Sequence, residues 1–200
     1  MGVAVVDSGG ANISSVLHAL RRLGAEPDFT ADASVITRAE RVILPGVGAA
    51  GRAMDVLRSH SLIEVLRKLT QPVLGICLGM QLLFDSSAED DARLLSLIPA
   101  RLEKIDGSGG LRVPHMGWNR IENRRTDSLT DTLDGHWFYF VHSYAAPTGD
   151  WTLAASTHGQ PFSAIVRQDN FYGVQFHPER SAGAGARLLH GFLESAPVRA

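Results

Sequence analysis

The chain contains one cysteine, Cys77, within the segment PVLGICLGMQLLF that runs from Pro72 to Phe84. Glycines stand two residues to each side of it, and G-I-C-L-G has the form of a nucleophile elbow. Such a sharp strand-to-helix turn strains the backbone of the nucleophile and leaves no room for side chains at the glycines. A helix starting behind Cys77 would favour the thiolate and offer the Leu78 amide to a developing oxyanion. We interpret Cys77 as a nucleophile, against the alternative of a buried structural cysteine.

A thiol nucleophile needs a base, and FHPER is the histidine segment with a suitable context. His177 ends an apolar run, Pro178 fixes the backbone, and Glu179 follows at a spacing that lets it orient the imidazole and stabilise its charged form. H-x-E alone is a weak signal, but with Cys77 it composes a Cys-His-Glu triad from distant segments. One cysteine with scattered histidines has no zinc-ligand spacing, so we expect no metal site. We read other histidines as ordinary surface or half-buried residues: His18, His60, His158 and His190.

Composition and charge argue against several classes of protein. The chain has 200 residues, of which 44% are hydrophobic, and this suits one domain spanning residues 1–200. The net charge is −2 with no basic block, which argues against nucleic acid or an anionic membrane surface as partner. A lone cysteine fits a reducing compartment. Because we find neither an export signal nor a membrane-spanning run, we expect a cytoplasmic protein.

The first half of the sequence alternates buried-type strands with helical patterns. VAVVD (3–7), RVILP (41–45) and PVLGI (72–76) are short apolar strands. Helical spacing follows each of them, from Asn12 to Leu23, from Met54 to Leu69 and from Leu78 to Phe84. Continuous apolar strands separated by helices indicate a parallel sheet covered on both faces. Cys77 then lies at the carboxyl edge of that sheet, where ligands bind in open α/β folds.

From about residue 101 the sequence changes to short β-like runs joined by turn residues, among them GWNRI, HWFYFVHSY, TLAAST, FSAIV and FYGVQF. Gln168-Asp169-Asn170 reads as a hairpin turn, and residues 182–193 return to helix. The predicted fold is therefore α/β, with a mostly parallel central sheet flanked by helices and an additional antiparallel portion in the C-terminal half.

Five ordered segments resemble the class I (triad) glutamine amidotransferases. PGVG (45–48), GICLGMQLLF (75–84) and FHPE (176–179) match that family in order and separation. PHMGWN (114–119) and FYFVHSY (138–144) are similar to one branch of it, the glutaminase subunits of imidazole glycerol phosphate synthase. The resemblance runs from Val3 to about Leu193 and implies the same fold.

The resemblance implies hydrolysis of L-glutamine, with no cofactor. It makes Cys77 the nucleophile, His177 the general base and acid, and Glu179 the orienting residue. It also implies an oxyanion hole formed by amides of Leu78 and of the PGVG loop around Val47 and Gly48, and a binding site for the amino-acid end of glutamine that comprises Gln81, His142, Ser143 and Tyr144. For His142 and Tyr144, simple strand packing is the alternative.

The resemblance further implies a heterodimer in which ammonia passes to a separate (β/α)8-barrel cyclase subunit. Asn12, Pro114, Met116 and Trp118 match segments that face this partner in the family. A large aromatic beside an apolar residue and proline also suits a desolvated interface anchor. The alternative for Trp118 is a place in the protein core.

The chain departs from the family pattern in its first loop, DSGGAN, where Ser8 and Ala11 replace an aromatic residue and a glycine, and at Ala50, where a bulky aromatic is common. The loop lacks G-x-G-x-x-G, so dinucleotide binding is not expected. Three rival functions remain: a glutaminase for another pathway such as anthranilate or guanylate synthesis, a cysteine hydrolase without a synthase partner, and a non-catalytic partner-binding module. PHMGWN argues against the first, and the intact triad argues against the last.

Overall fold

The structure is a computed structural model that describes residues 2–10 and 13–195. Its helices are α1 (Ile13–Arg22), α2 (Ala33–Arg38), α3 (Ala50–Ser59), α4 (Ile63–Arg67), α5 (Leu78–Gln81) and α6 (Ala182–Glu194), with 3-10 turns η1 (Ser108–Gly110) and η2 (Pro178–Arg180). Its strands are β1 (Gly2–Val6), β2 (Glu26–Thr30), β3 (Arg41–Gly46), β4 (Val73–Cys77), β5 (Phe84–Ser87), β6 (Ala92–Arg93), β7 (Ile98–Lys104), β8 (His115–Arg120), β9 (Glu122–Asn123), β10 (Trp137–His142), β11 (Tyr144–Ala145), β12 (Thr152–His158), β13 (Gln160–Gln168) and β14 (Phe171–Val174).

The largest sheet has the strand order β2-β1-β3-β4-β14-β13-β12-β9. Strands β2, β1, β3, β4 and β14 are parallel, and the remaining pairs β14-β13, β13-β12 and β12-β9 are antiparallel. The hairpin between β13 and β14 turns at Asp169, whose φ is +52°. The predicted α/β fold, with a parallel sheet extended by antiparallel strands, is confirmed.

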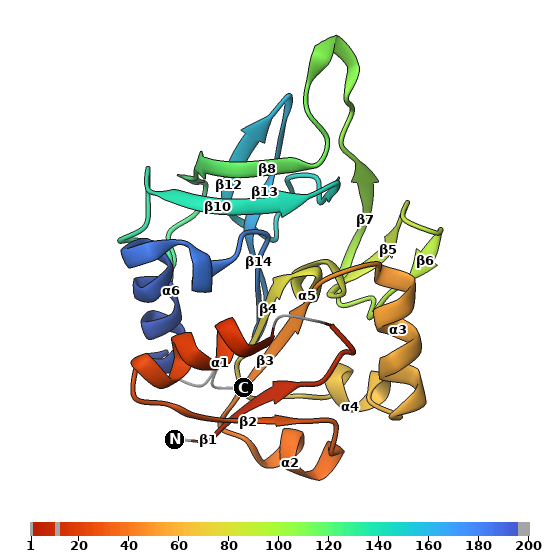
Figure 1. Cartoon of the computed structure of the whole chain (residues 1–200), viewed down its shortest axis with the longest axis vertical. Helices are drawn as coiled ribbons and strands as arrows, with labels where there is room; N and C mark the ends of the chain where they lie inside the picture. Colours follow the sequence, from red (N-terminus) through yellow and green to blue (C-terminus); the bar gives the residue numbers. More distant parts are fainter. Residues whose placement is uncertain (1, 11–12, 196–200) are drawn as a thin grey trace.

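Helices cover both faces of the parallel strands (Figure 1). Val3 and Val5 of β1 pack in one buried cluster with apolar residues of α1 and α6. Ala4 and Val6 point the other way, into a second cluster with residues of α3 and α4. Because successive side chains of a strand alternate between faces, an entirely apolar strand is what a sheet buried on both sides requires.

Two smaller sheets complete the C-terminal half. β8 and β10 form an antiparallel ribbon, and β11, β7, β5 and β6 form a four-stranded sheet. In Figure 1 the ribbon lies beyond the carboxyl ends of β3 and β4, the edge at which Cys77 ends its strand. The ribbon is thus placed to close over the site from above.

Three details differ from the sequence prediction. The helix expected over residues 78–84 ends at Gln81, and Phe84 begins strand β5 instead. The helical pattern of residues 54–69 is divided into α3 and α4 around Ser61, whose φ is +57°. Strand β2 and helix α2 were not predicted. Among the helices in the described ranges, none is long and apolar enough to cross a membrane.

Candidate active site

Cys77 occupies the strained turn that the glycine pattern predicts. It ends β4, its φ and ψ are 54° and −109°, and α5 begins at the next residue. A Cβ on Gly79 would lie 1.7 Å from the Leu44 carbonyl oxygen, and a Cβ on Gly75 would lie 2.5 Å from that of Gly79. Any side chain at either position would therefore displace backbone. The helix is shorter than predicted, so its contribution to thiolate stability rests on its first amides alone.

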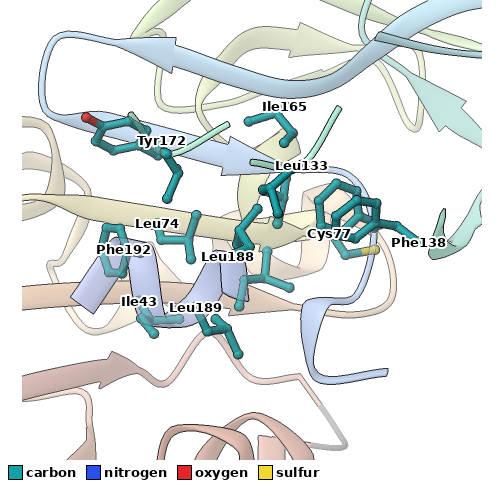
Figure 2. Close-up of a cluster of buried hydrophobic side chains, with 14 of the residues drawn as sticks. Ile43, Leu74, Cys77, Leu133, Phe138, Ile165, Tyr172, Leu188, Leu189 and Phe192 are labelled. Atoms are coloured by element: carbon teal, nitrogen blue, oxygen red, sulfur yellow. The ribbon is translucent and has the colours of Figure 1, made fainter. Parts of the chain in front are cut away.

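Figure 2 shows the sulfur of Cys77 at one end of the cluster that α6 buries against the sheet, beside Phe138. The Cys77 side chain is largely buried, with 7% of the residue exposed. Its Sγ lies 3.7 Å from the Val141 carbonyl oxygen. The thiol is thus held between the parallel sheet and strand β10 of the ribbon.

His177 and Glu179 form a buried hydrogen-bonded pair. Nδ1 of His177 lies 2.9 Å from Oε1 of Glu179, and only 10% and 3% of their side chains are exposed. The backbone N–H of His177 donates to the Tyr139 carbonyl, and the Ser181 hydroxyl donates to the His177 carbonyl. The turn η2, with Pro178 in its first position, places the Glu179 carboxylate at the Nδ1 edge of the ring. The backbone of His177 is thereby fixed to β10 and η2, while Oε2 of Glu179 is buried without a hydrogen-bond partner.

The charge state of His177 is set by its neighbours. Burial alone would lower the pKa of the imidazole, but hydrogen bonds and opposite charges at Cys77 and Glu179 together raise this pKa from 6.5 to about 10. His177 is therefore an imidazolium at neutral pH. An imidazolium next to a cysteine sulfur is the arrangement that stabilises a thiolate nucleophile.

A cavity of about 280 Å³ opens over the thiol. Except for Glu179, its lining brings together the residues that the sequence predicts for catalysis, the oxyanion hole and substrate binding: Val47, Gly48, Cys77, Leu78, Gln81, His142, Ser143, Tyr144 and His177. Pro114, predicted to face a partner, lines the cavity as well. Gly48 has a φ of +98°, a conformation that favours glycine. Glu89 also lines the cavity, and its carboxylate accepts from the Ala50 amide at 2.8 Å. Glu89 had no sequence signal.

Gln175 is a further polar residue of the site that the sequence analysis missed. It is fully buried, its Oε1 accepts from Nε2 of Gln81 at 3.0 Å, and its own Nε2 lies 4.0 Å from Sγ of Cys77. A polar residue inside the apolar run YGVQF was the available signal, because a buried amide needs partners.

The first loop is tied to the site by Ser8. Its hydroxyl donates to the Pro45 carbonyl at 2.8 Å, at the start of the PGVG loop. Ala50, the other departure from the family pattern, is fully buried at the start of α3. Asn12, predicted to face a partner, lies outside the described residues, as does Ala11.

One face of the β8–β10 ribbon is exposed and apolar. Met116 and Trp118 are 63% and 51% exposed, and Trp137 on the neighbouring strand is 53% exposed. Trp118 pairs with Tyr139 across the ribbon. A place for Trp118 in the core is therefore excluded, and this face remains open to a partner.

Within residues 2–10 and 13–195, no three His, Cys, Asp or Glu side chains are grouped as a metal site.

Comparison with known proteins identifies the family of the chain. The family model for class-I glutamine amidotransferases matches residues 4–195. The chain belongs to this family. It is 50% identical over 196 residues to the imidazole glycerol phosphate synthase subunit HisH of Salmonella typhimurium, a match that covers 97% of this chain and 100% of the relative. The HisH subunit of Escherichia coli K12 matches at the same identity and coverage. The family resemblance predicted from the sequence is thus confirmed.

Solved structures of other proteins share the fold. A crystal structure described as a glutamine amidotransferase matches with a TM-score of 0.74 at 22% identity, over 96% of this chain and 97% of its own. The structure of PurLQS from Thermotoga maritima matches with a TM-score of 0.71 at 19% identity, over 96% of this chain and 97% of its own. At these identities the likeness concerns the fold.

Proposed function

We propose that this chain is the glutaminase subunit of an imidazole glycerol phosphate synthase and hydrolyses L-glutamine to glutamate and ammonia. The observation that supports it most directly is the cavity lined by both Cys77, at its strained turn, and His177, whose ring is held by the buried Glu179 carboxylate. The naming of relatives at 50% identity as HisH subunits supports the same reaction.

In the first half of the reaction, the Cys77 thiolate attacks the side-chain amide carbon of glutamine. The carbonyl π electrons move onto oxygen, and the resulting oxyanion needs donors that are already in position. The Leu78 amide at the start of α5 is one, and amides of Val47 and Gly48 are the proposed second source. All three residues border the cavity together with the thiol.

The imidazolium of His177 then gives its proton to the departing nitrogen. The C–N bond breaks, ammonia leaves, and a γ-glutamyl thioester remains on Cys77. A water molecule attacks this thioester with His177, now neutral, as the base, and glutamate leaves as the thiolate and imidazolium are restored. Glu179 holds the ring and stabilises its charged form. His177 thus moves the proton in both halves of the reaction.

The amino-acid end of glutamine is proposed to bind to Gln81 and to His142, Ser143 and Tyr144, which join the end of β10 to the start of β11. These residues line the same cavity as the thiol. Gln81 is held by its Nε2, which donates to the Tyr144 carbonyl at 3.0 Å.

The partner is proposed to be a barrel cyclase subunit that receives the ammonia and forms imidazole glycerol phosphate and an aminoimidazole carboxamide ribotide. Pro114, just before β8, lines the cavity, while Met116 and Trp118 are exposed on β8 itself. A partner seated on this face would therefore lie next to the place where ammonia is released.

The test is the Cys77→Ala variant, assembled with a cyclase. Synthesis from glutamine should be lost, while synthesis from added ammonium salts continues, because the cyclase does not need the thiol. Trapping of a γ-glutamyl thioester in the wild-type chain by acid quench gives a direct second readout. Glutamine hydrolysis by Cys77→Ala at the wild-type rate would refute the proposal.

A further inference from the structure

Two buried histidines behind the candidate site are joined by a hydrogen bond. His115 of β8 and His142 of β10 are opposite each other in the ribbon, and Nδ1 of His115 lies 3.0 Å from Nε2 of His142. Each is only 5% exposed. His158 stacks on His115 with 4.1 Å between ring centroids, but its Nε2 lies 2.8 Å from the Arg112 carbonyl instead.

The groups at the two ends of this histidine pair, the Tyr144 carbonyl and the Asn119 amide, decide which ring nitrogens donate and which accept. At one end, Nδ1 of His142 lies 2.9 Å from the Tyr144 carbonyl, which can only accept. Nδ1 of His142 must therefore carry the proton, and in the neutral ring Nε2 must accept. It follows that Nδ1 of His115 donates to it.

The other end leads to the same assignment independently. The Asn119 amide is oriented by the backbone, because its Nδ2 donates to the Thr157 carbonyl and its Oδ1 accepts from the Arg120 amide. Its Nδ2 also lies 3.3 Å from Nε2 of His115. Since that atom of Asn119 is a donor, Nε2 of His115 is the acceptor and Nδ1 carries the proton. Both rings are thus the Nδ1–H tautomer.

Both rings must be neutral for this arrangement, because an imidazolium has a donor on each nitrogen. Burial lowers the pKa of His142 to about 3, although the hydrogen bond to the Tyr144 carbonyl opposes the change. Burial, together with the charge of His158, lowers the pKa of His115 to about 4. Neutral rings are therefore the stable state at neutral pH.

This series of hydrogen bonds, the chain of donors, ends at the Tyr144 carbonyl oxygen, which also binds the side chain of Gln81 in the cavity. The Tyr144 carbonyl accepts from both Nδ1 of His142 and Nε2 of Gln81. The second N–H of Gln81 goes to Oε1 of Gln175, which turns Nε2 of Gln175 toward the Cys77 sulfur. Both N–H groups of Gln81 are thereby used, and its carbonyl oxygen is the polar atom left for a ligand. An ammonium group requires such an acceptor.

We propose that His115 is a positioning residue for this site: through His142 it fixes the Tyr144 carbonyl, and hence the orientation of the Gln81 amide that meets the amino-acid end of the substrate. PHMGWN then has two roles, with Met116 and Trp118 on its exposed face and His115 and Asn119 on its inner face. The inference deepens the proposed glutaminase function, and its kinetic test rests on that function.

The first test needs no catalysis. Nitrogen chemical shifts of the histidine rings in the full-length chain, labelled with ¹⁵N-histidine, distinguish protonated from unprotonated ring nitrogens. His115 and His142 should both show a protonated Nδ1 and an unprotonated Nε2, assigned by loss of signals in single variants. A protonated Nε2 on either ring would overturn the inference, whatever the chain hydrolyses.

The second test uses three variants in the complex with cyclase. His115→Phe keeps a stacked ring but removes the donor, and His115→Asn keeps an N–H near the Nδ1 position. His115→Phe should raise the KM for glutamine at least about tenfold with kcat changed less than about threefold, and His115→Asn should recover most of that loss. His158→Phe, in the same stack but outside the chain of donors, is the matched control and should keep the wild-type KM.

An unchanged KM in His115→Phe, or an equal rise in His158→Phe, would overturn the positioning role. Cys77→Ala measured in parallel separates the two claims. If the wild-type complex shows no hydrolysis that depends on Cys77, the proposed function fails, and the ring-nitrogen shifts still decide whether the chain of donors exists. If a variant fails to fold, the ring-nitrogen shifts of the wild-type chain still test the inference.

Discussion

The buried amide of Gln175 lies between the proposed nucleophile and the proposed substrate-binding residue Gln81, with its Nε2 4.0 Å from Sγ of Cys77 and its Oε1 3.0 Å from Nε2 of Gln81. This N···S distance is at the long end for a hydrogen bond to sulfur. Such an N–H donor stabilises a thiolate more than a neutral thiol, because hydrogen bonds to charged groups are stronger. Gln175 therefore joins the two halves of the site.

Replacing Gln175 by Met tests whether the hydrogen bonds of Gln175, and not only its packing, contribute to the reaction. The variant keeps the length of the side chain but removes the donor to sulfur and the acceptor for Gln81. We expect kcat/KM for glutamine to fall at least about tenfold, the effect of losing one hydrogen bond to a charged group. Gln168→Met at the end of β13 is the control, and an unchanged kcat/KM in Gln175→Met would remove Gln175 from the site.

A second prediction concerns the alkaline side of the pH profile. Burial opposes the change, but hydrogen bonds and opposite charges raise the pKa of His177 from 6.5 to about 10, so the imidazolium proposed to protonate the departing nitrogen persists below about pH 10 and is lost above it. The same shift stabilises the folded chain fully below about pH 6.5, and this contribution disappears as the pH rises through about 10.

Glu179→Gln removes one of the charges that hold this proton. The alkaline limb of kcat/KM for glutamine should move toward neutral pH by about 1–3 units, the usual effect of one close opposite charge. Stopped assays between pH 6 and about 10.5 on both proteins would measure it. An identical limb in the two proteins would mean that Glu179 only packs against the ring.

Three strands of the parallel sheet, β1, β3 and β4, and the turn at Cys77 could be predicted from the sequence, because both leave strong local signals: unbroken apolar runs, and glycines where backbone approaches backbone. The helix predicted after Cys77 was too long. Residues 78–84 are almost all apolar and buried, and burial on every side removes the hydrophobic periodicity that would mark the end of a helix. Strand β2 went unrecognised because it is polar, half-exposed and contains Pro27 at the edge of the sheet.

Candidate site residues could be predicted from the sequence where the side chain itself carries the chemistry. Residues whose role depends on their hydrogen-bond partners could not. Cys77, His177 and Glu179 could be singled out by residue type and spacing. His115 and Gln175 could not, because their roles come from hydrogen bonds to residues 27 and 98 positions away. Histidine and glutamine inside apolar segments mark only that a partner must exist.

A third prediction concerns the exposed face of the ribbon. Trp118→Ala should weaken association with the cyclase by at least about 2 kcal/mol, or about 30-fold in Kd, because a large aromatic at the centre of an interface acts as an anchor. Trp118→Phe, which keeps most of the apolar area, should lose much less. Titration calorimetry with a check of thermal unfolding measures both, and wild-type affinity in Trp118→Ala would place the interface elsewhere.

The last prediction is that the isolated chain hydrolyses glutamine slowly and is activated by the cyclase, more so when the cyclase holds its nucleotide ligand. An oxyanion hole needs two donors, and the turn at Cys77 supplies only the Leu78 amide. The second must come from the PGVG loop. That loop is anchored at each end, by the hydrogen bond of Ser8 to the Pro45 carbonyl and by that of the Ala50 amide to Glu89. Between these anchors, Gly48 at a φ of +98° allows more than one orientation of its peptide.

A peptide that rests with its carbonyl where an N–H is needed removes one donor from the hole, which costs roughly 10²–10³ in rate. A partner that binds only the state with the N–H in place can supply that difference, because a ligand shifts an equilibrium by as much as its affinities for the two states differ. Steady-state hydrolysis should therefore rise from the chain alone, to the chain with cyclase, to the complex with nucleotide. Equal turnover in all three would mean that the hole is complete in the isolated chain, and that hydrolysis is limited by a step which the partner does not influence.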